Sequence, residues 1–408
     1  MDSQIKNKAL EIIKITDGKI CDNCLGRTFS KIVEGADNKQ RGIQIRKKLV
    51  KEGVNTLKSD SCYVCDGLIE RVDKKFLERI IEKIKSSGVE FSTFLVGTRV
   101  SKEIIDKEKA MHNKLGLDVE NIKKELNREI GKKISLKMEK DVEFVTPNII
   151  VLVDLLNDHV KLQINPLFIE GRYKKLIRGI PQTKWPCRKC RGKGCEYCNY
   201  TGKMYNESVE ELIEPEALKI SKGSSSKFHG AGREDIDVKM LGNGRPFVLE
   251  IKEPLIRKIN LEDLERKINK SANGKVEVSN LKFVEKNRRS IIKNSSKDTY
   301  KLYLAQVVLD KAVKLEDLEI LKSLKVIQQR TPIRVAHRRA DKVRIRYIKH
   351  LEYKMIAPKE IELLIECQGG LYIKELISGD GNRTKPSVSQ LLEKNAECKK
   401  LDVLEVNL

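Results

Sequence analysis

Apolar residues recur at helical spacing in some parts of this 408-residue chain and alternate with polar residues in others. The segment 74–88, KKFLERIIEKIKSSG, has the helical spacing and ends at a glycine, so it predicts a helix. A second, longer helix is predicted from about 102 to 130. Strand patterns occur in EFSTFLVGT, VEFVTPNIIVLVDLL and HVKLQINPLFIEG. This alternation of strands and helices over 75–180 indicates a small α/β domain with a basic surface.

The C-terminal half of the chain is richer in strand patterns. In IDVKMLGNGRPFVLEIKEP, two alternating stretches flank Gly242, Asn243 and Gly244, which predicts a β-hairpin. Further strands are predicted in NLKFVEK, DTYKLYLAQVVL, KVRIRYI and IELLIECQGG, and a helix is predicted at 261–270. The C-terminal half is therefore predicted to be α+β, with a mainly antiparallel sheet and flanking helices.

Composition and charge point to a class of partner. The chain has 82 Lys and Arg against 59 Asp and Glu, and its formal net charge of +23 favours a polyanion, by default nucleic acid. The length predicts two or three domains. No run of about 18 uncharged apolar residues is present. The N-terminus has no apolar signal core and resembles an amphipathic helix, so we expect no membrane contact, no export and a cytoplasmic location.

Eight of the ten cysteines form C-x2-C pairs. Such pairs in a large intracellular chain favour metal over disulfides, because two intervening residues let both thiolates reach one tetrahedral ion. The group PCRKCRGKGCEYC is compact enough to predict a zinc site by itself, whereas the earlier group needs two pairs to meet across a long loop. Iron–sulfur ligation is the alternative for both groups. The expected zinc ligands are Cys21, Cys24, Cys62, Cys65, Cys187, Cys190, Cys195 and Cys198. The other two cysteines, Cys367 and Cys398, are predicted to be buried thiols.

Further segments are candidates for chemistry. HGAGREDIDVKMLG places Asp235 and Asp237 at a loop-to-strand junction, as reactive carboxylates or as turn-capping, salt-bridged ones. The arginine-rich segment 328–348 predicts an ordered hairpin that grips nucleic acid, with a solvated charge run as the alternative. Lys374 follows a glycine pair among apolar residues, which suits an inward-pointing lysine that pairs with a carboxylate. The basic residues around Tyr173 suit phosphate contact and base stacking, or equally a solvated cationic loop.

Together these motifs resemble the archaeal-type tRNA pseudouridine synthases of the Pus-ten family. The resemblance lies in HGAGREDIDVKMLGNGRPFVLEI, DTYKLYLAQVVL, QQRTPIRVAHRRAD and GGLYIKELISGDGNRTKPSVSQLL, with CDNCLGR, CYVCDG, PCRKCRGKGCEYC and an RNA-binding module of the THUMP kind that ends in NPLFIEGRYKKLIRGIPQT. It covers nearly the whole chain in the family's order. It implies an N-terminal zinc-binding segment (1–73), a THUMP-like RNA-binding domain (74–184), a four-cysteine zinc knuckle or linker (185–204) and a pseudouridine synthase catalytic domain (205–408).

The resemblance also implies roles for individual residues. Asp235, in the GRED motif, would attack or deprotonate the target nucleoside, and Lys374 would supply a cation for this aspartate. Tyr300 would stack on the uracil, with Tyr303 as its rival. Asp237 fits no catalytic position of the motif and is expected to be structural. The residues expected to contact RNA are Arg233, Tyr303, Arg334, His337, Arg338, Arg339, Arg172, Tyr173 and Lys174.

The implied reaction is isomerisation of uridines 54 and 55 in the TΨC arm of tRNA, carried out by a monomer. It involves no redox change or net group transfer, so we expect no catalytic cofactor and only structural zinc. A methyltransferase would need a glycine-rich cofactor loop that opens a helix, and a thiolase would need a nucleotide-binding loop and a working cysteine, for which Cys367 is a candidate. A non-catalytic zinc RNA-binding protein would have lost the aspartate, the tyrosine or the cation. All three are present, so we favour the synthase.

Overall fold

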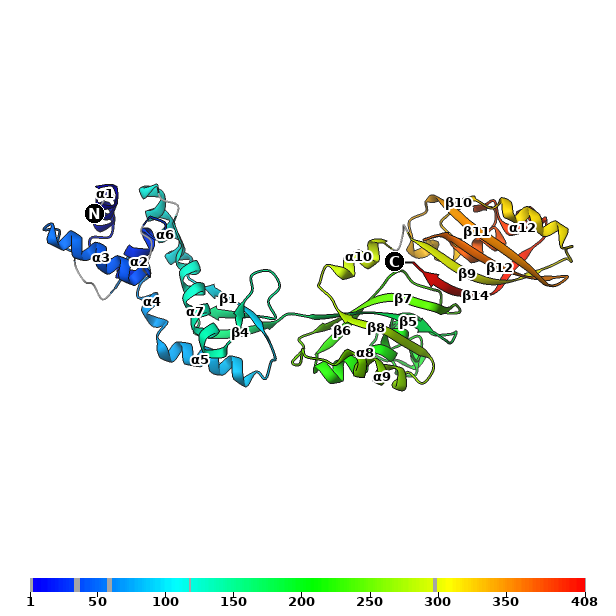
Figure 1. Cartoon of the computed structure of the whole chain (residues 1–408), viewed down its shortest axis with the longest axis horizontal. Coiled ribbons are helices and arrows are strands. Elements are labelled where there is room, and N and C mark those ends of the chain that lie inside the picture. Colours follow the sequence, from blue (N-terminus) through cyan, green and yellow to red (C-terminus); the bar gives the residue numbers. More distant parts are fainter. Residues whose placement is uncertain (1–2, 33–36, 57–60, 117–118, 296–298, 408) are drawn as a thin grey trace. The chain divides into compact units, whose positions relative to one another are not determined.

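A computed structural model of the chain describes residues 3–32, 37–56, 61–116, 119–295 and 299–407, without the side chains at 295 and 338. The chain divides into two compact units, Met1–Asn165 and Pro166–Leu408 (Figure 1). Within the ranges just given, no helix combines the length and the apolar composition needed to cross a bilayer.

The first unit combines helices with a small sheet. Its sheet has the order β2-β1-β3-β4, in which β1 runs parallel to both neighbours and β4 is antiparallel to β3. The predicted helix at 74–88 and the strand in EFSTFLVGT are confirmed as α5 and β1. The long helix predicted at 102–130 is wrong in extent, because Gly116 takes a left-handed φ of 58° and ends α6. The elements are α1 (Ser3–Ile15), α2 (Asp22–Thr28), α3 (Asn38–Lys51), α4 (Leu68–Arg71), α5 (Lys74–Ser86), β1 (Thr93–Arg99), α6 (Lys102–Leu115), α7 (Ile122–Met138), β2 (Asp141–Val142), β3 (Ile149–Asp154) and β4 (His159–Ile164).

A buried ion network ties α2 to α6 and α7. The Arg27 guanidinium lies 2.8 Å from Glu108 and 2.5 Å from Glu125, and all three side chains are at most 3% exposed. Glu108 also accepts hydrogen bonds from the backbone N–H of Ile122 at the start of α7. Both carboxylates are therefore paired with the same cation and hydrogen-bonded, as buried charges require.

The second unit is built on one ten-stranded, mainly antiparallel sheet, which confirms the α+β prediction. Its order is β13-β10-β11-β12-β9-β14-β7-β5-β8, with β6 also paired to β7. The elements are β5 (Leu167–Lys175), η1 (Glu196–Cys198), α8 (Val209–Ser221), β6 (Ser225–Gly230), β7 (Lys239–Lys252), α9 (Leu261–Ser271), β8 (Val276–Phe283), α10 (Arg288–Ser295), β9 (Tyr300–Leu309), η2 (Glu316–Ser323), β10 (Val326–Arg330), η3 (Ile333–Arg338), β11 (Val343–Ala357), β12 (Glu360–Gln368), α11 (Ile373–Ser378), β13 (Thr384–Lys385), α12 (Val388–Leu392) and β14 (Ala396–Val406).

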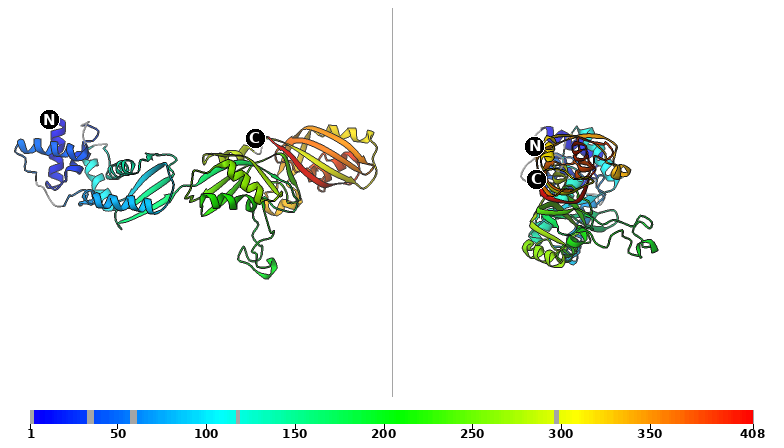
Figure 2. Two further views of the ribbon diagram at one scale, coloured as in Figure 1. Left: turned by 60° about the horizontal axis from the view of Figure 1, so that its bottom comes forward. Right: turned by 90° about the vertical axis from the view of Figure 1, so that its right-hand side faces the viewer.

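The division between the units differs from the boundary drawn at 184. Strand β5 pairs with β7 and β8, so 166–184 belongs to the large sheet and not to the preceding α/β unit. The segment 186–203 is an excursion from this sheet between β5 and α8, and Figure 2 shows it extending away from the strands.

The predicted hairpin around Gly242 and Gly244 is wrong. Strand β7 runs continuously from Lys239 to Lys252, pairing first with β14 and then with β5. Both glycines have positive φ, and a Cβ on Gly242 would lie 1.9 Å from the Leu404 carbonyl oxygen of β14. The glycines therefore permit a bend in one strand at close approach to its neighbour, instead of a turn between two strands.

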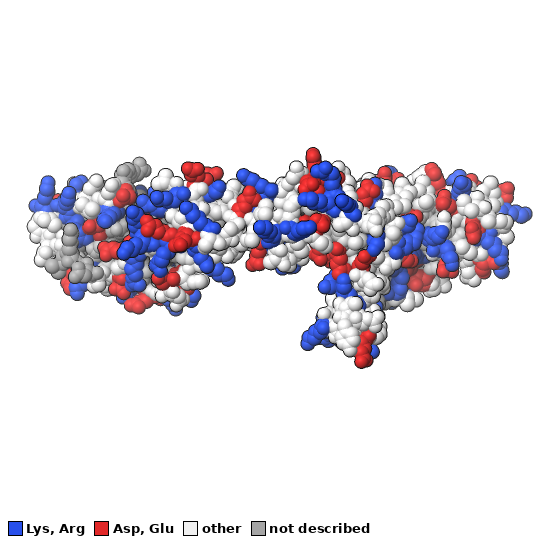
Figure 3. Space-filling model, turned by 90° about the horizontal axis from the view of Figure 1, so that it is seen from below, with Lys and Arg blue, Asp and Glu red and all other residues white. Residues whose placement is uncertain are grey.

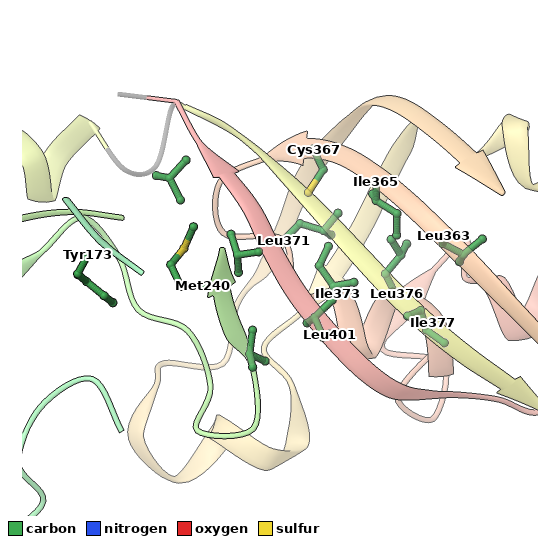
Figure 4. Packing of buried hydrophobic residues seen from close by; sticks show 14 of the residues in the cluster. Tyr173, Met240, Leu363, Ile365, Cys367, Leu371, Ile373, Leu376, Ile377 and Leu401 are labelled. Atoms are coloured by element: carbon green, nitrogen blue, oxygen red, sulfur yellow. The ribbon is translucent and has the colours of Figure 1, made fainter. Parts of the chain in front are cut away.

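The apolar core of the second unit joins the sheet to its helices. Buried residues of α8 and α9 pack against β5, β7 and β8, and α11 and α12 pack against the strands of the other half. Cys367 is fully buried among Ile365, Leu371 and their neighbours, which confirms the prediction of a buried thiol (Figure 4). Burial raises its pKa to about 12, so it is a protonated thiol at neutral pH and unsuited to nucleophilic work. Cys398 is partly buried.

We expect Arg27→Met to destabilise the first unit by about 3–5 kcal/mol, because it leaves Glu108 and Glu125 buried without a cation. Urea unfolding of the full chain measures this when far-UV circular dichroism follows both units and the emission of the single tryptophan, Trp185, follows the second unit. Only the dichroism transition should move. Lys74→Met, at an exposed ion pair, is the control and should change stability by less than about 0.5 kcal/mol. A shift no larger than the control's would contradict the expectation.

Candidate active site

A small polar pocket of about 100 Å³ lies where the loop between β6 and β7 meets β9, η3 and α11. This loop carries the GRED motif at 232–235. The pocket is lined by Arg233, Glu234, Asp235, Val238, Arg245, Lys301, Tyr303, Arg334, Leu371, Tyr372, Ile373, Lys374, Leu401 and Val403. Cations, carboxylates and a tyrosine from distant parts of the sequence thus converge on one site.

The carboxylate of Glu234 anchors the loop on its buried side. This side chain is fully buried, accepts a hydrogen bond of 2.9 Å from the Tyr173 hydroxyl, and lies 2.8 Å from the Arg245 guanidinium. Arg245 also donates to the Ala231 carbonyl, and Gln182 donates to both the Gly232 carbonyl and the Tyr173 hydroxyl. Buried polar groups that satisfy one another in this way give the loop a single conformation.

A buried lysine, Lys175, holds the same loop through its backbone. Its ammonium group donates to the carbonyls of Ile180, Asp235 and Ile236 at 3.0, 3.0 and 3.1 Å. Burial lowers the pKa of Lys175 to about 8, and burial likewise lowers the pKa of Lys301, on the pocket wall, to about 8. Both lysines therefore carry their charge near neutral pH at a cost in stability.

Asp235 extends from the loop toward η3, where its carboxylate lies 2.9 Å from the Arg334 guanidinium. Arg334 also pairs with Glu375 of α11 at 2.5 Å, and its guanidinium lies over the Tyr372 ring. Burial alone would lower the pKa of Arg334, but the two carboxylates raise it, so this arginine is a permanent cation beside Asp235. About a third of the Asp235 side chain is exposed, so a substrate can reach it.

The prediction that Lys374 supplies the cation for Asp235 is wrong in this structure. The Lys374 ammonium group lies 2.8 and 2.6 Å from the two carboxylate oxygens of Asp237. Burial raises the pKa of Asp237, but the Lys374 hydrogen bonds outweigh burial and lower it overall. Arg334, which was assigned to RNA contact, holds Asp235 instead. The ion pair is consistent with the structural role expected for Asp237.

The two candidate tyrosines of β9 lie on opposite faces of the strand, because they are three residues apart. Tyr303 lines the pocket, together with Lys301 on the same face. Tyr300 does not line this pocket, and the ammonium group of Lys349 lies 5.5 Å from the centre of its ring. Tyr303, the rival candidate, is therefore the tyrosine that lies in the same pocket as Asp235.

The basic segment around Tyr173 does not offer this ring to a base, contrary to the prediction of base stacking. Tyr173 is fully buried, and the Arg172 guanidinium donates to three backbone carbonyls at the β7 bend and β14. Lys174 pairs with Glu277 of β8. Inner positions of a strand in the middle of a sheet are covered on the core side, so Tyr173 and Lys175 are structural.

The arginine-rich segment is an ordered hairpin, as predicted, because β10 and β11 pair antiparallel. Asp341 closes the base of the intervening loop by pairing with Arg330 and Arg383. His337 and Arg339 are exposed on this loop, and the side chain of Arg338 lies outside the described part of the chain. Arg233, at the other wall of the pocket, lies over the ring of Trp185 with 4.8 Å between its guanidinium carbon and the ring centre.

The eight paired cysteines form two groups, and in each group the four sulfur atoms lie within 4.8 Å of one another. The Cys187–Cys195 and Cys190–Cys198 sulfur pairs are 3.9 and 3.8 Å apart, and one pair of the first group is 3.8 Å apart. A tetrahedral ion with Zn–S bonds of about 2.3 Å separates its ligands by about 3.8 Å. Both groups therefore fit a structural zinc ion, with no open coordination position for chemistry.

Sequence reasoning missed the residues that support the loop: Glu234, Arg245 and Lys175. A signal for Lys175 was present, since Ile169, Tyr173 and Lys175 alternate along β5 and so share a face. A lysine in phase with core positions is unusual and indicates a buried cation. For Glu234 no local pattern distinguishes the buried carboxylate from its two aspartate neighbours.

Comparisons with known proteins agree with this geometry. The family described as Pus10, C-terminal, matches residues 168–407, and the archaeal Pus10 THUMP domain matches residues 76–154. Three relatives are each named tRNA pseudouridine synthase Pus10. The protein of Methanothermobacter marburgensis is 51% identical over 97% of both chains. That of Methanocaldococcus jannaschii is 43% identical over 95% of this chain and 92% of its own, and that of Pyrococcus furiosus is 42% identical over 98% of both.

An aspartate held by a cation in a pocket of a mainly antiparallel sheet, together with these matches, defines a pseudouridine synthase with a THUMP domain before it. The chain belongs to the Pus10 family. It is an isomerase that converts uridine to pseudouridine, so the resemblance seen in the sequence is confirmed.

We expect Lys175→Met to change how stability depends on pH. The unfolded chain holds the Lys175 proton up to about pH 10.5 and the folded chain only to about pH 8, so the unfolded state binds more protons between these values. The free energy of unfolding of the wild type should therefore rise across this window relative to that of Lys175→Met. Urea unfolding followed by Trp185 emission at pH 7.5, 9 and 10 checks this.

The matched control is Lys174→Met, one residue earlier on the same strand, where the lysine is partly exposed and paired with Glu277. Its pH profile should run parallel to that of the wild type. Lys301 is unchanged in every variant, so its own titration cancels in the comparison. A Lys175→Met profile parallel to the wild type would contradict the expectation.

Proposed function

We propose that the substrate is tRNA and that the targets are uridines 54 and 55 of the TΨC arm. The relatives named tRNA pseudouridine synthase and the net charge of +23 support a tRNA substrate. The family resemblance supports the choice of arm. A tRNA substrate is also consistent with a cytoplasmic enzyme that acts as a monomer. The proposed mechanism rests on one observation, which is that Asp235, Arg334 and Tyr303 line the same pocket.

In the proposed mechanism the target uridine leaves its stack and enters the pocket, which costs a few kcal/mol. Asp235 then attacks or deprotonates the nucleoside, while Arg334 provides the counter-charge. The bond between N1 and C1′ breaks, the uracil turns, and a bond between C5 and C1′ forms. The proton on C5 is lost and N1 regains one, so atoms and electrons balance without a cofactor.

The neighbouring groups have supporting roles. Tyr303 stacks on the uracil, and Lys374 keeps Asp237, two residues from the reacting carboxylate, in an ion pair of its own. Arg233 contacts the RNA backbone at the pocket entrance. His337, Arg338 and Arg339 grip the tRNA from the hairpin loop, while the THUMP domain and the N-terminal zinc segment provide further RNA surface.

Replacing Asp235 tests the proposal. Purified protein is incubated with an unmodified tRNA transcript and no added cofactor, and pseudouridine is mapped chemically. The wild type should form product in the TΨC arm, whereas Asp235→Asn should form none and should bind tRNA within about twofold of the wild type. Asp237→Asn is the matched control, a carboxylate in the same loop that should retain product. Loss of tRNA binding in Asp235→Asn would show that Asp235 is structural, and product from this variant would exclude it from the chemistry.

Replacing the two β9 tyrosines distinguishes between them. Tyr303→Ala removes the ring that lines the pocket, so its kcat should fall by at least about tenfold, since stacking of a base on an aromatic ring contributes about 1–3 kcal/mol. Tyr303→Phe keeps the ring and should retain most activity. Tyr300→Ala should stay within about threefold of the wild type. Single-turnover rates at saturating tRNA measure these effects, and the opposite ranking of the two alanine variants would restore Tyr300 as the stacking residue.

A further inference from the structure

The second cysteine group forms a separate lobe of the catalytic unit. The lobe begins at Pro186 and ends at Lys203, between β5 and α8, and an isolated antiparallel β-bridge joins these two residues. A hydrogen bond of 2.7 Å from the Cys187 N–H to the Gly202 carbonyl closes the lobe. We call this lobe, residues 186–203, the cysteine knuckle. It extends away from the sheet (Figures 2 and 3).

The cysteine knuckle presents two tyrosines to solvent. Tyr197 is 54% exposed and Tyr200 is 72% exposed. Both line one open hollow of about 490 Å³, which lies within the usual size range of ligand sites, about 300–1,000 Å³. The Lys189 ammonium group lies over the Tyr197 ring at 4.6 Å from its centre. Neither tyrosine belongs to the group of converging cysteines, and more than half of each side chain is open to solvent.

The charge of the same lobe favours RNA. The cations of this lobe are Arg188, Lys189, Arg191, Lys193 and Lys203, of which Lys203 pairs with Glu211 of α8, and its one carboxylate is Glu196. Figure 3 shows Lys and Arg side chains on the projecting lobe. Cations interleaved with exposed aromatic rings suit a nucleic-acid strand, whose phosphates bind the cations while unpaired bases stack on the rings.

The base of the cysteine knuckle touches the catalytic loop. Trp185 precedes the lobe, its ring lies edge-on to the Tyr205 ring at 5.4 Å, and the Arg233 guanidinium lies over it. Arg233 is two residues before Asp235 and lines the active-site pocket. Arg233 therefore links the base of the lobe to the wall of the pocket.

We propose that the cysteine knuckle is a second RNA-binding site, which stacks unpaired bases on Tyr197 and Tyr200 and holds the adjoining phosphates with its cations. The proposal rests on the proposed function in one respect, namely that the RNA is the tRNA substrate. A protein partner could also use exposed tyrosines, but the excess of cations and the contact with the catalytic loop favour RNA. The zinc ion would shape the lobe without touching the bases.

The test compares Tyr197→Ala/Tyr200→Ala with Tyr197→Phe/Tyr200→Phe in the full zinc-loaded chain. Two probes are titrated, the unmodified tRNA transcript and a single-stranded oligouridine, and quenching of Trp185 emission reports binding at the base of the lobe. Stacking needs the ring and not the hydroxyl, so the phenylalanine variant should bind both probes within about twofold of the wild type. The alanine variant should bind both at least about tenfold more weakly. Its zinc content should remain that of the wild type, which shows that the lobe is folded.

The outcomes separate the two proposals. Equal binding of both probes by the wild type and the alanine variant, with zinc retained, would overturn the RNA site and would leave a protein partner for the tyrosines. Product in the TΨC arm from the wild type in that case would show that the proposed function survives. Weaker oligouridine binding by the alanine variant, with no pseudouridine formed in tRNA by the wild type, would support the RNA site and contradict the tRNA substrate.

Discussion

The active site depends on one buried carboxylate. Glu234 lies under the GRED loop, and its contacts with Tyr173 and Arg245 connect the loop to β5 and β7. A buried ion pair contributes little net stability, but removing either partner leaves an uncompensated charge. The network therefore selects one loop conformation. Its neighbours in the sequence, Arg233 and Asp235, are turned outward as a consequence, which leaves the Asp235 carboxylate partly exposed on a fixed loop.

Charge is distributed over the site so that the two aspartates of the loop face different cations. Asp235 faces Arg334, and Asp237 faces Lys374, although the four residues come from one loop and two distant segments. Arg334 is itself oriented by Glu375, so it presents a fixed guanidinium to Asp235. Charges fixed in this way are preorganised, and preorganised charge is the usual source of electrostatic catalysis in enzymes. The buried Lys175 adds a backbone anchor beneath the same aspartate.

The sequence by itself determined those features that depend on residues close together in the chain. Cysteine spacing predicted the two groups whose sulfur atoms converge in the structure. Two residues between the cysteines of a pair let both thiolates bind one tetrahedral ion. Alternation predicted the strands of the antiparallel sheet, and the ordered motifs from GRED to GGLYIKEL predicted the family. The arginine-rich hairpin was also predictable, because its turn and its alternating strand lie in one segment.

Tertiary structure alone decided which side chains meet. The motif favours Tyr300, with Tyr303 as its rival, and the face of β9 that turns to the pocket brings Tyr303 there instead. The motif predicts Lys374 as the cation beside Asp235, but the packing of η3 and α11 places Arg334 there and Lys374 beside Asp237. Tyr173 lies among basic residues in the sequence, and its burial by β7 and β8 depends on long-range pairing. Contacts between distant segments leave no periodic signal in the segments themselves, and this is why only the folded chain decided these positions.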